Sequence, residues 1–531
     1  FNSYSSSYSS VTGYNNDQDK MPNMSYALQY KNYGGANDNW NNLAYYLVAG
    51  YNYKNKYFLN GTMSMEASSR FGKNADSGLK LCGVTWGLFP SLQAAWLISS
   101  EKWFNVKGVD YLKLTGGYEM SGNDNIDYYA TRTYFSNFQF LDKATGLVLA
   151  NIKNPKLQWE TTKRFNIGLQ ASLLNNRVNL ALEYFNSKTD NLLTRKSVSD
   201  VTGLSTMWSN DGALSNKGVD FNINAMLIQH KDWRWQAGFS IGHYKNEITS
   251  LPTSNLNIIR TYALNEDGSR GAETQIHGYT SSIYGSNNVL TAVGKAAGLF
   301  YGYKTAGVFA TDAEAASAGK YGYLRYPTGL SEQPSRDFRA GDVHFVDQNG
   351  DGWINEADMV VIGDPNPDIY GNIFTSLSWK SLKLDVNFKY SLGNDVYNYQ
   401  RSQLESLNTN WNQTTAAVNR WRYEGQKTDM PRAMYTTSDQ WVNNERFSDR
   451  WIEDGSYLKL KNIRLTYKIP VNLSWLLGLS VWGECNNVFT ISKYTGNDPE
   501  FSAGNGVLYQ GIDAGYLPQS RNFTLGVTIN L

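Results

Sequence analysis

The feature that most constrains this fold is a strict alternation of apolar and polar residues between Phe165 and Tyr184. From 165 to 173 every odd position is apolar and every even position is Asn, Gly, Gln or Ser, and from 178 to 184 every even position is apolar. Such alternation is typical of a β-strand with one apolar and one polar face. Asn175 and Asn176 lie between the two halves, and both tolerate the left-handed backbone of a tight turn. The segment is therefore predicted to be a hairpin of two antiparallel strands.

Strand length points to a membrane. Each arm of the hairpin is about ten residues long, roughly what a tilted strand needs to cross a bilayer and longer than the mean strand of a soluble sheet. The same pattern recurs in segments 45–53, 56–66, 111–120, 219–227, 233–241, 382–390, 457–467 and 523–531, the last of which ends at Leu531. We expect roughly sixteen such strands, an even number within the range of outer-membrane barrels. The predicted fold is all-β, a transmembrane antiparallel β-barrel.

Composition is compatible with this fold. The 531 residues include 47 Gly, 37 Tyr, 22 Phe and 16 Trp, yet the hydrophobic fraction is only 41% and the mean hydropathy is −0.48. A transmembrane barrel also averages polar, because only alternate residues face lipid. No run of about eighteen apolar residues occurs, which excludes transmembrane helices. A membrane role would therefore depend on strands.

Charge and cysteine content exclude other classes of protein. The formal net charge is +1, and no cluster of Lys and Arg indicates nucleic-acid binding. Cys82 and Cys485 fit no metal or redox spacing. The chain opens at Phe1 in a polar FNSYSSSYSS run without an initiator Met or a signal peptide. We therefore expect a mature or truncated product, with upstream sequence missing.

Turns and loops are predicted to lie on opposite sides of the barrel. Segments 252–297, 311–368 and 391–450 lack sustained periodicity, and loops of that length are usually functional. The turn 230–232 is short by comparison and is followed by Trp233 and Trp235, which fit an interfacial aromatic girdle. Short turns on one side and long extracellular loops on the other are typical of outer-membrane barrels.

Several motifs, in order along the chain, carry a family resemblance. They are LFPSLQAAWLIS (88–99), YLKLTGGYEMSGN (111–123), NPKLQWETT (154–162), NDGALSNKGVD (210–220), GLFYGYKTAGVF (298–309), GDVHFVDQNGDGWINEADMVVIGDPNP (341–367), DGSYLKLKNIRLTYKIP (454–470) and NNVFTISKYTGNDPE (486–500). Together they resemble the SusC-like TonB-dependent outer-membrane transporters of Bacteroidetes, from about residue 45 to the end.

The resemblance implies a 22-stranded barrel whose import is driven by TonB. It also implies a SusD-like surface lipoprotein over the barrel mouth and often a dimer of such pairs. The family's N-terminal plug, TonB box and first strands have no counterpart in residues 1–531, so the chain is expected to be the C-terminal part of the barrel. A second departure is the final Leu531, where the family usually ends in an aromatic residue.

The sharpest local motif is DQNGDGWINEAD, at residues 347–358. It offers six oxygen donors in the order of an EF-hand-type loop: Asp347, Asn349, Asp351, the Trp353 carbonyl, Asn355 and Asp358. Alternate residues would converge on a hard cation, and Gly352 would allow the tight turn. The predicted ion is Ca²⁺ or Mg²⁺, with a rigidifying role. Two features weaken this hypothesis, because GDVHFV before the loop is strand-like and Asp358 is shorter than Glu; the alternative is a turn-rich acidic loop held by Asx hydrogen bonds.

Catalysis has little support in the sequence. The four histidines, His230, His243, His277 and His344, have no recognisable Ser or Cys partner motif and are expected in loops or at the membrane interface. The Glu453–Asp454 pair is expected to be a solvated loop pair. We therefore predict no catalytic residues and no organic cofactor.

The predicted function is an outer-membrane nutrient importer. Flat aromatic rings stack on sugars and amides bind hydroxyls or peptide backbone, so the substrate would be an oligosaccharide or an oligopeptide. Three alternatives stay open: a passive porin, a soluble or surface β-rich glycan-binding protein, and a hydrolase. A full-length sequence without a plug would favour the porin, and a chain soluble without detergent would favour the glycan-binding protein.

Overall fold

The protein is described here by a computed structural model. The structure describes residues 1–13, 31–72, 74–76, 78–140, 144–253, 258–262, 272–285, 289–328, 335–471 and 475–530. Leu531 and parts of the predicted loops 252–297 and 311–368 lie outside these residues. No helix of the described residues is long and apolar enough to cross a membrane.

One sheet of fifteen strands dominates the described chain, against the roughly sixteen predicted. Its order is β1 (Asn2–Gly13), β2 (Lys31–Tyr53), β3 (Tyr57–Ser68), β5 (Val84–Leu97), β6 (Val109–Asn123), β9 (Glu160–Leu173), β10 (Val178–Ser197), β11 (Thr206–Gln229), β12 (Trp233–Ser250), β22 (Ile369–Trp379), β23 (Leu382–Leu392), β26 (Tyr457–Ile469), β27 (Gly478–Ser492) and β29 (Asn522–Asn530), with β4 (Leu79–Leu81) beside β5. Neighbours such as β2 and β3, or β22 and β23, pair antiparallel. The predicted all-β class is confirmed.

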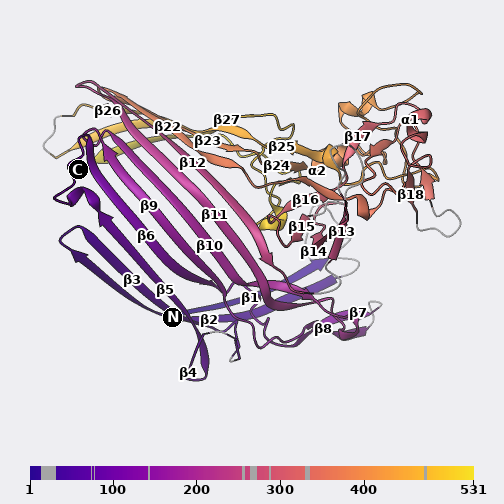
Figure 1. The fold of residues 1–531 in the computed structure, drawn as a ribbon, viewed down its shortest axis with the longest axis horizontal. Helices are drawn as coiled ribbons and strands as arrows, with labels where there is room; N and C mark the ends of the chain where they lie inside the picture. The colour runs from indigo at the N-terminus through magenta and orange to yellow at the C-terminus, as the bar shows by residue number, and fades with distance from the viewer. Residues whose placement is uncertain are drawn as a thin grey trace. The chain divides into compact units, whose positions relative to one another are not determined.

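The described chain divides into two compact units. Unit 1 comprises Phe1–Trp96, Thr115–Asn166 and Ser187–Leu214, and unit 2 comprises Leu97–Leu114, Ile167–Asn186 and Ser215–Leu531. Strands β6, β9, β10 and β11 contribute residues to both units. Within unit 2, β12 and the later strands of the sheet run side by side (Figure 1).

The backbone is left-handed at the predicted Asn175–Asn176 turn and also in the turn between β2 and β3. Asn175 and Asn176 have φ of 58° and 59°, and Lys54 and Asn55 have φ of 55° and 53°. A bulge interrupts segment 457–467, since the β26–β27 register shifts between Leu460 and Asn462. Turn chemistry therefore fixes where these hairpins reverse.

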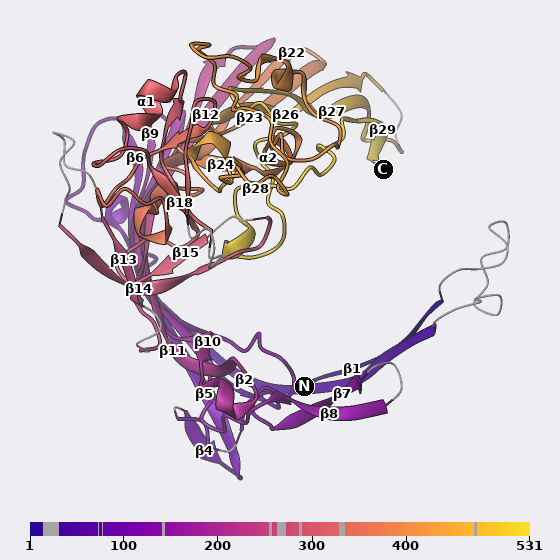
Figure 2. The same ribbon diagram turned by 90° about the vertical axis from the view of Figure 1, so that its right-hand side faces the viewer.

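The segments predicted as long loops contain structure of their own. Together with strands from outside those bounds, they form small sheets of β13 (Ile258–Thr261), β14 (Thr274–Ser281), β15 (Val289–Ala292), β16 (Leu299–Gly302) and β21 (Val360–Gly363); β17 (Thr305–Val308) with β20 (Val343–Phe345); β18 (Arg325–Pro327) with β19 (Ser335–Asp337); and β24 (Asp395–Asn398) with β25 (Ile452–Asp454) and β28 (Ile512–Asp513). The strands from outside those bounds are β16, β17, β25 and β28. Two short helices, α1 (Asp312–Ala316) and α2 (Tyr399–Leu404), belong to the same region, and β7 (Tyr134–Phe140) pairs with β8 (Ala144–Asn151) in unit 1. In Figures 1 and 2 the small elements of unit 2 gather at one end of β12, β22 and β23.

The buried cores lie in these connecting regions. Within unit 2, Phe338, Val343 and Phe345 belong to one apolar cluster and Phe300 and Trp451 to another. In unit 1 the segments around β5 and before β9 form a third cluster, which contains Phe71, Phe89, Ile126, Ala130, Leu157 and Trp159. The long strands contribute few residues to these clusters, because their apolar side chains point elsewhere.

Candidate functional site

The apolar residues of the alternating strands are exposed, as a lipid-facing surface requires. In unit 2, Leu169, Leu182 and Ile373 are 39%, 46% and 42% exposed, and in unit 1 Phe165 is 49% exposed. Leu180 is half-buried. Large apolar residues repeated along strands in this way are rare on soluble monomers and mark contact with lipid or a partner.

The opposite face of the unit 2 strands carries amides. A groove of about 690 Å³ on this face is lined by residues of β9, β10, β11, β12, β22, β23 and β26. Its amide residues, which we call the amide surface, are Gln170, Asn179, Asn222, Asn224, Asn372, Asn387 and Asn462. Each amide offers two donors and an acceptor without net charge. The groove therefore suits hydroxyls, peptide groups and water.

Hydrogen bonds hold several of these amides in place. Gln236 Nε2 donates to Asn224 Oδ1 at 2.7 Å, and Ser172 Oγ donates to Asn179 Oδ1 at 2.6 Å. The sequence predicted a polar strand face here but no individual ligand residues. The signal that would have found them is the presence of Asn or Gln at polar positions of several alternating strands.

The predicted cation loop is held by Asx hydrogen bonds in this structure. Asp347 accepts from the Gly350 and Gly352 amides at 2.7 and 2.8 Å, and Asp351 accepts from the Trp353 amide at 2.8 Å. Gly352 has φ of 85°, as expected for the tight turn. The preceding element is strand β20, as the sequence indicated.

Asp358 closes the loop from a fully buried position. It accepts from the Gln348 and Asn355 amides at 2.9 Å each. Burial raises the pKa of Asp358 to about 7, the bond from Asn355 opposes that rise, and the nearby Asp347 carboxylate adds to it. A bound cation would offset both the cost of burying the Asp358 charge and its repulsion by the Asp347 carboxylate.

The oxygen donors of loop 347–358 fit a hard cation only if the carboxylates, amides and backbone carbonyl all take part. Within the described residues no group of three or more His, Cys, Asp and Glu side chains is arranged to hold a metal. The carboxylates of Asp347, Asp351 and Asp358 would therefore need the side-chain oxygens of Asn349 and Asn355 and the carbonyl oxygen of residue 353. Cation binding stays a prediction.

A buried arginine lies close to this loop. Arg446 is 6% exposed, and its Cζ lies 4.4–5.6 Å from the ring centres of Tyr303, Tyr326, Phe338 and Phe345. Burial lowers the pKa of Arg446, and its attraction to the surrounding tyrosines and carboxylates partly compensates. The aromatic faces thus stabilise a cation that the low-dielectric core would otherwise disfavour.

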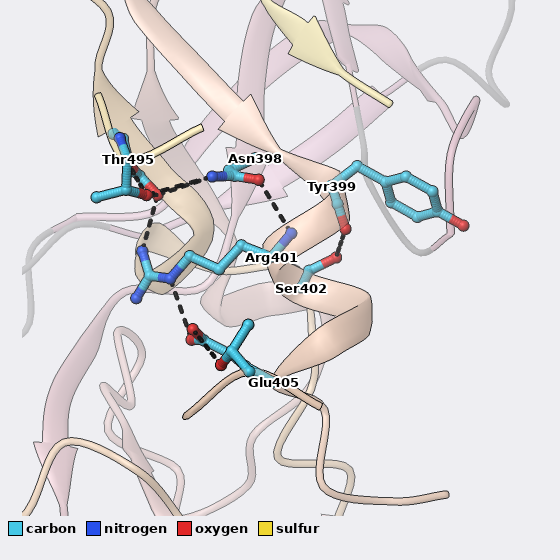
Figure 3. A network of polar contacts seen from close by, with 8 residues as sticks. Asn398, Tyr399, Arg401, Ser402, Glu405 and Thr495 are labelled. Carbon is cyan, nitrogen blue, oxygen red and sulfur yellow. Dashed lines mark hydrogen bonds and ion pairs between the residues drawn. The ribbon is translucent and has the colours of Figure 1, made fainter. Parts of the chain in front are cut away.

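The prediction of a solvated Glu453–Asp454 pair is wrong for Glu453, which is the centre of a polar network, whereas Asp454 is exposed. The Glu453 side chain is 10% exposed and accepts from Arg401 Nη1 at 3.0 Å and from the Thr495 amide at 2.8 Å. Arg401 also donates to Glu405 at 3.1 Å (Figure 3). Asn398 joins the network and accepts from the Arg401 amide at 2.9 Å, capping α2. The network joins α2, β25 and the segment after β27.

The histidines lie on separate elements. His243 is on β12, His277 on β14 and His344 on β20, while His230 is in the turn before β12. Three of the four are therefore in strands, where loop or interfacial positions were expected. The His344 ring stacks on Phe309 at 4.4 Å, and His243 Nδ1 lies 2.6 Å from the Asp368 carbonyl oxygen. These are packing and backbone contacts.

Comparison with known proteins gives the resemblance a quantitative basis. No protein-family model matches the chain. TonB-dependent receptor P26 of Formosa agariphila is 30% identical over 494 residues, covering 90% of this chain and 45% of the receptor. TonB-dependent receptor SusC of Bacteroides thetaiotaomicron is 28% identical over 510 residues, covering 92% of this chain and 43% of SusC.

The predicted resemblance to SusC-like TonB-dependent receptors is confirmed. The RagAB peptide importer in its closed-closed state has the same fold, with a TM-score of 0.70 at 22% identity, over 97% of this chain and 50% of that chain. The transmembrane β-barrel class is thereby confirmed, as is the expected location in the outer membrane. The chain spans less than half the length of the curated relatives that it matches.

Proposed function

We propose that this chain is the C-terminal portion of an outer-membrane nutrient importer. The observation that carries the proposal is the two-faced strand: exposed apolar residues such as Leu169 and Leu182 alternate with the amide surface on the same strands. A lipid-facing exterior and a wet, polar interior are what a polar solute needs to cross the membrane. The loop regions 252–297, 311–368 and 391–450 would lie outside the cell, and the plug would belong to the part of the protein beyond this chain.

The proposed partners are TonB, a SusD-like lipoprotein and a second copy of the pair. Both relatives are TonB-dependent receptors, which supports energy coupling by TonB, and the similarity to SusC motivates the lipoprotein. These relatives are named as receptors, which also supports a non-enzymatic role. TonB would act through the N-terminal region of the whole protein.

The proposed substrate is an oligosaccharide or an oligopeptide. Amides on the inner face can pair with either sugar hydroxyls or peptide groups. The similarity in fold to RagAB, a peptide importer, supports the peptide class. Loop 347–358 would bind Ca²⁺ or Mg²⁺ as a rigidifying ion, which its oxygen donors favour.

Uptake measurements test the proposal. In the parent organism, deletion of the gene is expected to abolish uptake of at least one labelled oligosaccharide or oligopeptide, and collapse of the proton-motive force should abolish the same uptake. Uptake that needs the gene but survives the uncoupler would favour a passive porin. Unchanged uptake of every substrate in the deletion strain would contradict the importer.

A further inference from the structure

Unit 1 has a pocket of its own. It has a volume of about 610 Å³, and its walls come from β2, the segment 124–134, Arg70 and the start of β11. The residues that define its chemistry are Arg70, Asp127, Tyr128, Tyr129, Tyr134 and Trp208. Four aromatic rings with a guanidinium and two carboxylates, those of Asp127 and Asp38, are an unusual lining for a surface that only connects strands.

The wall formed by Arg70 is rigid. The Arg70 guanidinium lies 4.5 Å from the Trp40 ring and 5.0 Å from the Tyr128 ring. Its Nη1 donates to the Asp124 carbonyl oxygen at 2.7 Å, and the same residue forms an ion pair with the Asp124 carboxylate at 3.5 Å. A side chain fixed by two rings and a carboxylate loses little freedom when a ligand binds.

Asp127 is held with one oxygen available. Trp208 Nε1 donates to Asp127 Oδ2 at 3.2 Å, and Arg195 Nη2 lies 3.5 Å from the same oxygen. Among the described residues no partner contacts Asp127 Oδ1. The carboxylate is therefore oriented and can accept further hydrogen bonds from a ligand.

The charges around the pocket disfavour an ionic ligand. Arg195 lies 4.6 Å from the Trp208 ring and Arg132 lies 5.9 Å from the Tyr129 ring. With Arg70 over Tyr128, cations already occupy faces of three of the four rings. A cationic ligand would meet these arginines. An anionic ligand would meet Asp127 and Asp38, which also lines the pocket. The lining suits a neutral ligand with an apolar face and several hydroxyls.

We infer that this pocket binds a pyranose ring of a neutral oligosaccharide. The C–H face of such a ring carries partial positive charge and packs on the negative face of an aromatic ring. Asp127 Oδ1 would accept hydrogen bonds from adjacent sugar hydroxyls, and Tyr134, 38% exposed, would supply a stacking face. The inference rests on the proposed import function, and it favours sugar over peptide as the substrate class.

Binding to purified protein tests this inference. The full-length protein that carries this chain would be titrated in detergent, by isothermal calorimetry, with hexasaccharides of glucose, mannose, galactose and xylose and with hexa-alanine. At least one sugar is expected to bind, and Tyr134→Ala and Asp127→Asn should each weaken binding at least tenfold. Tyr134→Phe should restore it. The matched controls Tyr435→Ala and Asp439→Asn, at exposed positions of unit 2, should have no effect.

Two results would overturn the inference. One is the absence of binding by all four sugars, whether or not hexa-alanine binds, and the other is sugar binding that neither pocket variant weakens. Uptake separates this failure from failure of the importer. If uptake requires the gene but is unchanged in both variants, the sugar pocket alone is contradicted. If the deletion strain takes up every substrate normally, the importer is contradicted. The calorimetric titration then decides independently whether the pocket binds sugar.

Discussion

Gly371 on β22 has no room for a side chain. A Cβ added there would overlap the carbonyl oxygen of Ser240 on the neighbouring strand β12. Because that oxygen belongs to the backbone, relief would require the two strands to separate. Gly371→Ala is expected to destabilise the sheet by about 1–3 kcal/mol, measured as urea unfolding in detergent micelles. Gly61→Ala is the control, since its nearest neighbour would be Leu92 Cδ1 at 3.9 Å; equal loss in both variants would contradict the packing argument.

The acidic loop makes a second prediction for single residues. Addition of Ca²⁺ should raise the thermal unfolding temperature of the protein, because a cation would neutralise Asp347, Asp351 and Asp358. Asp351→Asn removes one charged donor and is expected to reduce the shift. Asp439→Asn, at an exposed position elsewhere, should leave it intact. An unfolding temperature that does not change in millimolar Ca²⁺ or Mg²⁺ would show that Asx hydrogen bonds alone hold this loop.

At this scale the sequence predicted residues whose chemistry is local. Asn175 and Asn176 could be assigned to a turn because Asn tolerates positive φ, and both adopt it. Glu453 could not be assigned correctly, since its partners Arg401 and Thr495 are 52 and 42 residues away in the sequence. Burial of a carboxylate depends on such distant partners.

The network on Glu453 predicts a pH dependence of the loop elements. Burial alone would raise the pKa of Glu453, but hydrogen bonds from Thr495 and Arg401 outweigh it, and the pKa lies below its usual 4.5. The stabilisation is therefore complete above 4.5 and is lost as the pH falls through the lower pKa of the folded state. Hydrogen exchange of segment 395–405 should accelerate over that range in the native protein.

The variant Glu453→Gln separates this effect from general acid unfolding. This variant should make hydrogen exchange of segment 395–405 fast already at neutral pH. It should also remove most of the pH dependence of that exchange, because the titrating carboxylate is absent. Glu356→Gln, at an exposed position, is the matched control and should behave like the native protein. An acid response that survives in Glu453→Gln would assign the effect to other groups.

Strand β9 allows a test of its two faces with adjacent residues. Leu169→Arg places a charge on the exposed apolar face and should cost about 2–4 kcal/mol if that face meets the bilayer midplane. Gln170→Arg places the same charge beside the groove, where water can solvate it, and should cost far less. Folding into lipid vesicles as a function of urea measures both. Equal costs for the two variants would contradict the assignment of faces.

Elements with an apolar period of two were predictable, and elements without it were not. Strand β23 was expected over 382–390 and spans Leu382–Leu392. Strand β1, by contrast, is the run NSYSSSYSSVTG, which has almost no apolar residues to alternate. The strands of the small sheets in the loop region are likewise short. Their buried residues follow no period of two along the sequence, because distant tertiary contacts decide which residues are buried.

At the scale of the whole molecule, the buried cores and the apolar faces of the long strands lie in different environments. The buried clusters lie in the connecting regions, while residues of β29 such as Leu525 and Val527 are 87% and 62% exposed. A chain of this kind is stable only if lipid covers the exposed apolar residues. We therefore expect the protein to require detergent or lipid for solubility.

Spin labelling tests most directly whether the strands separate lipid from water. With Cys82 and Cys485 replaced, single labels would be placed at Leu182 and Leu465 on the apolar face and at Asn222 and Asn462 on the amide surface, in protein reconstituted into lipid vesicles. Labels at the leucines should collide with dissolved oxygen far more than with a water-soluble nickel complex, and labels at the asparagines should show the reverse. Labels at both leucines that are shielded from oxygen and nickel alike, as in a dry protein core, would contradict the membrane-spanning barrel.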